Sequence, residues 1–159
     1  MAVPGTIDDL RALEDLKARY CRLLDTKDWA GFREVFHDDL VSDTTSSGGL
    51  VITGADEFVA FVSTTLAKAV TVHQVHQPEL TVDSPTTAHG IWAMQDVVRF
   101  GRGLTMQGYG HYLETYEKVD GQWRIRTSTL TRLREELATP LFTVFLSDRI
   151  KRRLARLAR

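Results

Sequence analysis

Hydrophobic and polar positions alternate so regularly along residues 87–100 that this stretch predicts one long β-strand with two distinct faces. On one face every residue from Ala88 to Phe100 is apolar or small, with the exception of Asp96. Burying an unpaired carboxylate costs on the order of several kcal/mol. We therefore expect Asp96 either to find a hydrogen-bond donor or to take up a proton, and it is the first candidate functional residue.

The chain before residue 70 shows helical spacing of its apolar residues. Thr6 and Asp9 have the spacing of a capping box, so a first helix is expected to begin near Ile7. Asp28 can cap a second, short helix that runs through Phe36. A weakly alternating strand at 40–45 and a third helix opening at residue 54 complete this half of the chain.

Four long β-rich stretches follow, and turn-forming residues separate them. They cover residues 71–82, 87–100, 104–119 and 122–133. Helices followed by hairpin-linked strands predict an α+β fold, in which N-terminal helices pack on a curved, mostly antiparallel sheet and form a cone with a pocket between the layers. Residues 143–159 have the pattern of an amphipathic helix. We expect one domain over 1–139 and a basic amphipathic C-terminal helix within 140–159 that packs on or near it.

Composition and charge narrow the function. A chain of 159 residues with 43% hydrophobic residues fits one domain with a substantial core. Six basic residues lie within 149–159, so the remaining 14 basic and 21 acidic residues give the rest of the chain a charge of −7. An acidic body argues against a nucleic-acid partner and against stable membrane association. The basic segment is expected to act as a lid or a subunit contact.

The same counts bear on location and on metal binding. No signal-like or membrane-length apolar segment is present, so we expect a cytoplasmic protein. The single Cys21 allows no intrachain disulfide. His73 and His76 are three residues apart on a strand and therefore face opposite sides, and no acidic cluster accompanies them. We expect no metal site and no cofactor.

Two further residues of the first helix are candidates for chemistry. Asp25 lies where this helix ends, and a carboxylate there faces the negative end of the helix dipole, which suggests another use. A solvated loop aspartate is an equal alternative. Tyr20 precedes Asp25 by five residues, so the two converge only if the helix end deviates or the phenol reaches back. A core aromatic residue with its hydroxyl at the rim is the alternative for Tyr20.

The last two strands offer less specific candidates. His111 shares a face with Tyr109, and the opposite face carries Gly108 and Gly110, which suggest a bend or a close backbone approach. In the final strand, strict alternation would put Trp123, Ile125, Thr127, Thr129 and Thr131 on one face, although a row of threonines is also ordinary for a strand.

Taken together, these motifs resemble the SnoaL-like branch of the NTF2-like superfamily over roughly residues 6–134. The resemblance rests on the segment Asp25-Thr-Lys-Asp-Trp29, on His73 at the start of the meander, and on the segment Val119-Asp-Gly-Gln-Trp-Arg-Ile125 before the last strand. The chain is most similar to the scytalone dehydratase and bile-acid 7α-dehydratase group. That resemblance implies a working set at Tyr20, Asp25, His73 and Asp96, with His111 as a second histidine. Leu24 stands where scytalone dehydratase has a tyrosine, and the family's arginine is Arg126, Arg132 or Arg134.

The resemblance implies a cofactor-independent dehydratase that acts on a hydrophobic polycyclic hydroxy ketone, such as a steroid or polyketide, by His–Asp acid–base catalysis. A ketosteroid-isomerase-like isomerase, a polyketide cyclase and a non-catalytic binding module of the same fold are the alternatives. Relatives bury the open sheet face by self-association, so a homodimer or homotrimer is expected. The expected substrate contacts are Trp29, Phe58, Trp92, Met94, Tyr109, Thr127 and Thr129.

Overall fold

The computed structural model describes residues 6–101, 103–147 and 150. Three helices come first: α1 (Ile7–Thr26), α2 (Trp29–Glu34) and α3 (Ala55–Leu66). The predicted cap of α1 is confirmed, because the Asp9 amide donates to Thr6 Oγ1 at 3.2 Å. Asp28 caps α2 as predicted by accepting from the Gly31 amide. The second helix is shorter than predicted, since Phe36 already begins a strand.

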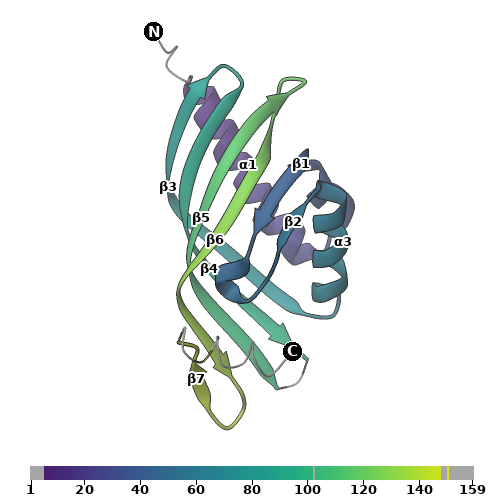
Figure 1. Ribbon diagram of the computed structural model, residues 1–159, viewed down its shortest axis with the longest axis vertical. Coiled ribbons are helices and arrows are strands. Elements are labelled where there is room, and N and C mark those ends of the chain that lie inside the picture. The colour runs from purple at the N-terminus through teal and green to yellow at the C-terminus, as the bar shows by residue number, and fades with distance from the viewer. Residues whose placement is uncertain (1–5, 102, 148–149, 151–159) are drawn as a thin grey trace.

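The strands are β1 (Phe36–Asp43), β2 (Val51–Thr53), β3 (Val70–Ser84), β4 (Thr87–Phe100), β5 (Leu104–Val119), β6 (Gln122–Ala138) and β7 (Thr143–Phe145), and a short 3-10 helix, η1 (Thr45–Ser47), precedes β2. They form one curved sheet in the order β2-β1-β6-β5-β4-β3, with β7 added to the far end of β6 (Figure 1). The pairing of β1 with β6 is parallel and the others are antiparallel. The predicted α+β fold of helices on a curved, mostly antiparallel sheet is confirmed.

Helix α1 runs along the inner face of the sheet, and α3 covers the part near β1 and β2 (Figure 1). The core between these layers is mainly aliphatic and aromatic, and it contains Leu13, Leu16, Phe32, Phe36, Leu40 and Ile125. One charged pair is buried with it: Lys17 of α1 lies 2.7 Å from Glu114 of β5, and neither side chain is exposed. Tyr116 and Ser128 also donate to Glu114, so this carboxylate has several partners.

Two irregularities in β6 change which side chains face inward. The register with β5 shifts between Ile125 and Thr127 and again between Arg132 and Arg134. Each extra residue reverses the alternation that follows it. Ile125 therefore faces the core, whereas Thr127 pairs with Thr115 on the outer face. The expectation that Thr127 and Thr129 share a face with Trp123 and Ile125 is wrong for this reason.

The C-terminal segment differs from the prediction. Residues 143–145 form β7 and pair with residues 136–138 of β6, so the amphipathic helix predicted from Thr143 is wrong for this part. The strand β6 continues beyond Leu133, which allows this pairing. Of the rest of the predicted helix, residues 148, 149 and 151–159 lie outside the described residues. In the part of the chain that is described, no helix has both the length and the apolar character needed to cross a membrane.

Candidate active site

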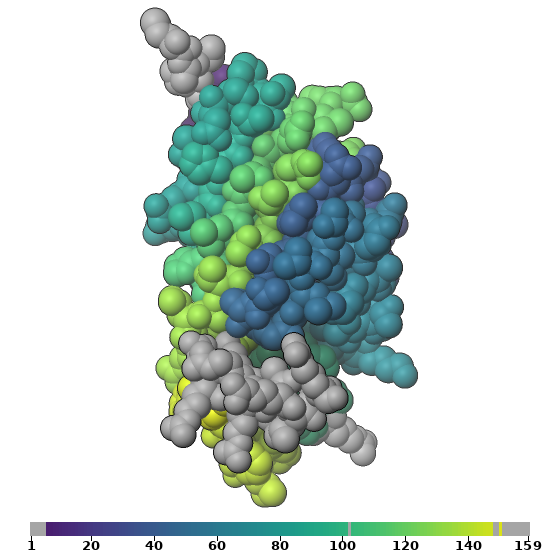
Figure 2. Space-filling view, viewed as in Figure 1, coloured from purple at the N-terminus to yellow at the C-terminus, as the bar shows by residue number. Residues whose placement is uncertain are grey.

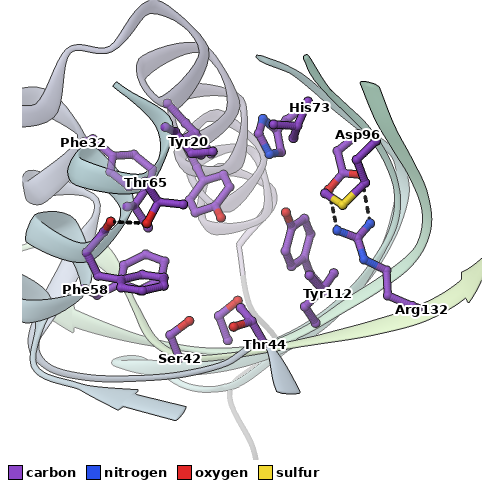
Figure 3. Close-up of a pocket in the computed structure, with 18 of the residues that line it drawn as sticks. Tyr20, Phe32, Ser42, Thr44, Phe58, Thr65, His73, Asp96, Tyr112 and Arg132 are labelled. Atoms are coloured by element: carbon purple, nitrogen blue, oxygen red, sulfur yellow. Dashed lines mark hydrogen bonds and ion pairs between the residues drawn. The ribbon is translucent and has the colours of Figure 1, made fainter. Parts of the chain in front are cut away.

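A cavity of about 220 Å³ lies between the helices and the inner face of the sheet. Most of its wall is apolar, from Leu24, Phe32, Phe58, Val62, Val98 and Leu130. Tyr20, His73, Asp96, Tyr112 and Arg132, from one helix and four strands, form a polar wall, and the hydroxyls of Ser42, Thr44 and Thr65 lie elsewhere in the lining (Figure 3). The cavity thus combines an apolar chamber with a small number of convergent polar groups, which is the usual composition of a small-molecule site.

His73 lines this wall, and Asp25 contacts it from outside the residues that line the cavity. Asp25 Oδ1 lies 2.7 Å from His73 Nδ1, and Asp25 Oδ2 accepts from the His73 backbone amide at 2.7 Å. The hydroxyl of Thr71 donates to Asp25 Oδ1 at 2.9 Å. Because three donors surround this carboxylate, its place at the negative end of α1 is compensated. The predicted hydrogen bond between Asp25 and His73 is confirmed, although of the two only His73 lines the cavity.

The pKa of Asp25 follows from this environment. Burial by itself raises the carboxyl pKa, but the hydrogen bonds and charge of His73 and the hydrogen bond from Thr71 outweigh it and hold the pKa below its usual value. An ionised Asp25 can only accept a hydrogen bond from Nδ1, so the ring hydrogen of His73 lies on Nδ1. The other ring nitrogen, Nε2, is then free to act as a base.

Asp96 was expected either to find a hydrogen-bond donor or to take up a proton, and the structure shows a donor. The guanidinium of Arg132 donates to both carboxylate oxygens, at 2.9 and 2.6 Å, and both side chains are almost fully buried. Burial lowers the pKa of Arg132, but hydrogen bonding and charge from Asp96 outweigh it and raise this pKa. Among the three arginines left open by the sequence, Arg132 is the one that reaches the cavity.

Gly108 makes this ion pair possible. It lies directly across from Asp96 in the sheet, and a Cβ atom there would collide with the Arg132 guanidinium and the Asp96 carboxylate. The close approach that the glycines of β5 predicted is therefore an approach of charged side chains at Gly108. At Gly110, in contrast, a Cβ atom would meet the backbone of Thr131.

Two phenols complete the polar wall. The hydroxyls of Tyr20 and Tyr112 point into the same space (Figure 3), and their ring centroids are 5.8 Å apart. Burial raises the pKa of both phenols, so each keeps its hydrogen and acts as a donor. The Lys17 ammonium lies 4.0 Å from the centre of the Tyr20 ring and 3.7 Å from that of Tyr112, and Lys17 does not line the cavity. Sequence reasoning missed Tyr112, although its position on the glycine face of β5 was a signal.

Several predicted site residues lie elsewhere. His111 and Tyr109 are on the outer face of β5, because Gly108, Gly110 and Tyr112 occupy the inner one. Thr127 and Thr129 are on the outer face of β6. None of these four side chains lines the cavity.

The expected apolar contacts divide in the same way. Phe58 lines the cavity, as predicted. Trp92 is buried in the core and donates to the Tyr116 hydroxyl at 2.6 Å, whereas Trp29 packs near Phe32 outside the cavity wall. Met94 does not line the cavity, but its sulfur lies 3.4 Å from the guanidinium of Arg132, which does. No residue of the segment 140–147 lines the cavity.

Within the described residues, no group of three or more His, Cys, Asp and Glu side chains could hold a metal ion.

The sequence comparison is decisive for the family: the model of the SnoaL-like domain matches residues 5–129. The chain belongs to the SnoaL-like family. This SnoaL-like chain is also 27% identical over 129 residues to the protein named "Probable cyclase FGR4" of Gibberella zeae, which covers 74% of this chain and 86% of that protein.

Solved structures share the fold of this SnoaL-like protein. A "Putative Scytalone Dehydratase" from Novosphingobium aromaticivorans matches with a TM-score of 0.74 and 21% identity, over 81% of this chain and 87% of that one. A "putative aromatic ring hydroxylase" from the same species matches with a TM-score of 0.77 and 22% identity, over 86% and 96%. The names of these similar proteins span cyclase, dehydratase and hydroxylase, so the activity of this chain has to be argued from its own site.

Proposed function

We propose that this protein catalyses the cofactor-independent loss of water from a hydrophobic hydroxy ketone, with His73 as the acid–base group. The observation that carries the proposal is that His73, which lines a mostly apolar cavity, lies 2.7 Å from Asp25. Asp25 fixes the ring hydrogen on Nδ1, so Nε2 is the atom that takes a proton from substrate. His73 itself is only 7% exposed, which keeps bulk water away from this step.

The reaction needs two proton transfers, and one imidazole can perform both. His73 Nε2 removes a hydrogen from the carbon next to the carbonyl, and the electron pair forms an enolate. The enolate then collapses to a carbon–carbon double bond and expels the hydroxyl from the neighbouring carbon. The proton held on Nε2 passes to the departing oxygen and completes a water molecule, so the imidazole returns to its starting state.

The enolate oxygen requires donors that are already in place. The hydroxyls of Tyr20 and Tyr112 lie in the same space, and their raised pKa values keep both protonated at neutral pH. Tyr112 shares a side-chain hydrogen bond with Tyr20, which leaves one phenol hydrogen for the enolate oxygen. The Arg132 guanidinium adds positive charge at the same wall, although Asp96 offsets much of it. These groups favour an oxygen that gains negative charge during the reaction.

The substrate follows from the remaining wall. Aromatic and aliphatic side chains from α2, α3 and the sheet favour a flat, hydrophobic ring system such as a polyketide or steroid ring, with the hydroxy ketone directed to the polar side. Two similar proteins carry the names of a dehydratase and a cyclase, and both reactions can begin by removing a proton next to a carbonyl. An isomerase that relies on a protonated Asp96 is disfavoured, because Asp96 accepts from Arg132 at both oxygens.

Incubation with cyclic β-hydroxy ketones tests the proposal, with mass spectrometry to detect a product that has lost one water. We expect turnover by the unaltered protein and its near-complete loss in His73→Ala. His89→Ala is the matched control, because His89 also pairs with an aspartate at 2.9 Å but lies on the exposed face of the sheet. Saturable binding without product would favour a binding module. A rearranged product that keeps its water would favour a cyclase or an isomerase.

A further inference from the structure

The residue that follows α1 has an unusual backbone conformation. Lys27 has φ 63° and ψ 28°, in the left-handed region, where a helix most often ends with glycine because a side chain is unfavourable there. Among the described residues, the one other non-glycine residue with positive φ is Asp120, in the turn between β5 and β6. The backbone alone would therefore favour glycine at position 27, and the lysine side chain needs another explanation.

The side chain of Lys27 reaches across to β3. Its ammonium group donates to Thr71 Oγ1 at 2.7 Å, and Thr71 is buried. An ammonium group can only donate, so Thr71 must accept in this contact. The single hydroxyl hydrogen of Thr71 is then left for Asp25 Oδ1, which lies 2.9 Å away. The direction of both hydrogen bonds is fixed by this chemistry.

This chain of contacts ends at the candidate base. Asp25 accepts from Thr71, from the His73 backbone amide and from His73 Nδ1. We propose that Lys27 and Thr71 are positioning residues that hold Asp25 ionised and oriented, and thereby set the ring hydrogen of His73. This inference rests on the proposed function, in which Asp25 orients the base. It also gives a physical role to the lysine in the step Asp25-Thr-Lys-Asp-Trp29.

Other charged and titratable groups lie near Asp25. Cys21 is buried one turn earlier on α1, and burial raises the pKa of its thiol to about 11, so it stays neutral. Burial lowers the pKa of Lys27, which the charge of Asp25 partly offsets. Across the sheet, Asp96 lies beside His73 and is paired with Arg132. Lys27 is thus the cation connected to Asp25 through a hydrogen-bonded hydroxyl.

Three variants test this relay, the chain of hydrogen bonds from Lys27 through Thr71 to Asp25. Thr71→Val removes the hydroxyl, Thr71→Ser keeps it, and Lys27→Gly removes the ammonium while supplying the residue that the backbone favours. Nuclear magnetic resonance can follow the pH at which the Asp25–His73 pair takes up a proton, using the imidazole signal that disappears in His73→Ala. The pair is observed as a unit, because its two groups share one hydrogen bond. No substrate is needed for this readout.

Loss of a donor to Asp25 makes protonation of the pair easier. The midpoint is the pH at which half of the Asp25–His73 pairs have taken up a proton. We expect it to rise by roughly half a pH unit to one unit in Thr71→Val and in Lys27→Gly, and to stay unchanged in Thr71→Ser. Lys27→Gly should unfold at the same temperature as the unaltered protein or at a higher one, because the left-handed position is relieved. Asp120→Gly, which relieves the same backbone conformation far from the cavity, should match this thermal effect without moving the midpoint.

An unchanged midpoint in both Thr71→Val and Lys27→Gly would overturn the relay. A large loss of thermal stability in Lys27→Gly with no change of midpoint would also overturn it, since Lys27 would then serve the fold alone. A protein that turns over no hydroxy ketone contradicts the proposed reaction, whereas the midpoint measurement still decides the relay.

Discussion

Asp96 and Arg132 show how single residues in this cavity depend on their immediate partners. Both side chains are almost completely buried, and the guanidinium donates to both carboxylate oxygens. Removing one member of such a pair leaves an uncompensated buried charge, which costs about 3–5 kcal/mol in comparable cases. The pair occupies the space above Gly108 that any other residue's Cβ would need.

The first prediction concerns this space. Gly108→Ala is expected to lower the free energy of unfolding by about 1–3 kcal/mol, because the added methyl group forces the ion pair or the backbone to move. Chemical denaturation measures the change. Gly103→Ala is the control, since among the described residues a Cβ there would meet only Pro140, at 3.9 Å. Equal stability of the two variants would show that the ion pair is not held as tightly as the structure indicates.

At the scale of elements, α1 connects the cavity to the rest of the fold. Its first turn carries Asp9, its middle carries Lys17 and Tyr20, and its last turn carries Asp25. Asp9 accepts from the ammonium of Lys118 at 2.5 Å and from the Trp123 indole at 3.0 Å, which fixes the start of the helix against β5 and β6. The two ends of α1 are therefore both held to the sheet by aspartates.

The second prediction follows from Asp9. Hydrogen bonds from Lys118, Thr6 and Trp123 lower the pKa of Asp9 to about 2. Because this pKa lies below that of an unfolded aspartate, about 3.9, the ionised form stabilises the fold above about pH 4 and this contribution is lost as the pH falls toward 2. Asp9→Asn should therefore be less stable than the unaltered protein near pH 6, by about 1 kcal/mol or less, with a gap that closes in acid.

Urea unfolding at a series of pH values measures this gap. Asp8→Asn serves as the control, because Asp8 is an exposed neighbour in the same turn. A gap between the Asp9→Asn variant and the unaltered protein that stays constant down to about pH 2 would contradict the assigned role of Asp9.

The bounds of the helices and strands were more predictable from the sequence than the side of the sheet on which each side chain lies. The predicted strands 87–100 and 104–119 have the observed bounds, because strong alternation and flanking turn residues define them. Alternation distinguishes two faces but does not say which one is inner, so it could not exclude His111, which the family resemblance implied and which lies on the outer face. The extra residues in β6 leave no clear signal in a Thr-rich strand, so the positions of Thr127 and Thr129 could not be foreseen.

The candidate site was predictable where local chemistry conflicted with its surroundings. Asp96 in an apolar strand and Asp25 at the negative end of a helix both stood out, and both have specific partners. Tyr112 gave no such conflict, because an aromatic residue in a strand is ordinary. Arg132 depended on the strand register, which single-sequence patterns do not determine.

At the scale of the whole molecule, none of the helices α1, α2 and α3 covers the outer face of the sheet. Figure 2 shows this outer face, with α1 almost entirely hidden behind the sheet. Ile91 and Leu113 lie directly across from each other on it, and their side chains are 36% and 41% exposed. Val72 adds a further exposed apolar side chain on β3. We propose that this face is the contact between copies of the chain in a dimer or trimer.

The third prediction tests that contact. Sedimentation at micromolar concentration should give a mass of two or three times 18.0 kDa for the unaltered protein. Leu113→Glu should reduce the mass to that of one chain, because it places a charge opposite Ile91. Leu50→Glu should leave the assembly unchanged, since Leu50 is exposed in the loop between η1 and β2. A single-chain mass for the unaltered protein would refute the proposed contact.

The most direct measurement isolates the step that defines the proposed chemistry, the removal by His73 of a hydrogen next to a carbonyl. A hydrophobic cyclic ketone without the leaving hydroxyl can undergo this step alone, and proton resonance in heavy water follows the exchange of its α-hydrogens. We predict exchange with the unaltered protein, a decrease of about 100- to 10,000-fold in His73→Ala, a smaller decrease in Asp25→Asn, and no change in His89→Ala. Exchange at the unaltered rate in His73→Ala, with a ketone shown to bind the cavity, would contradict the account.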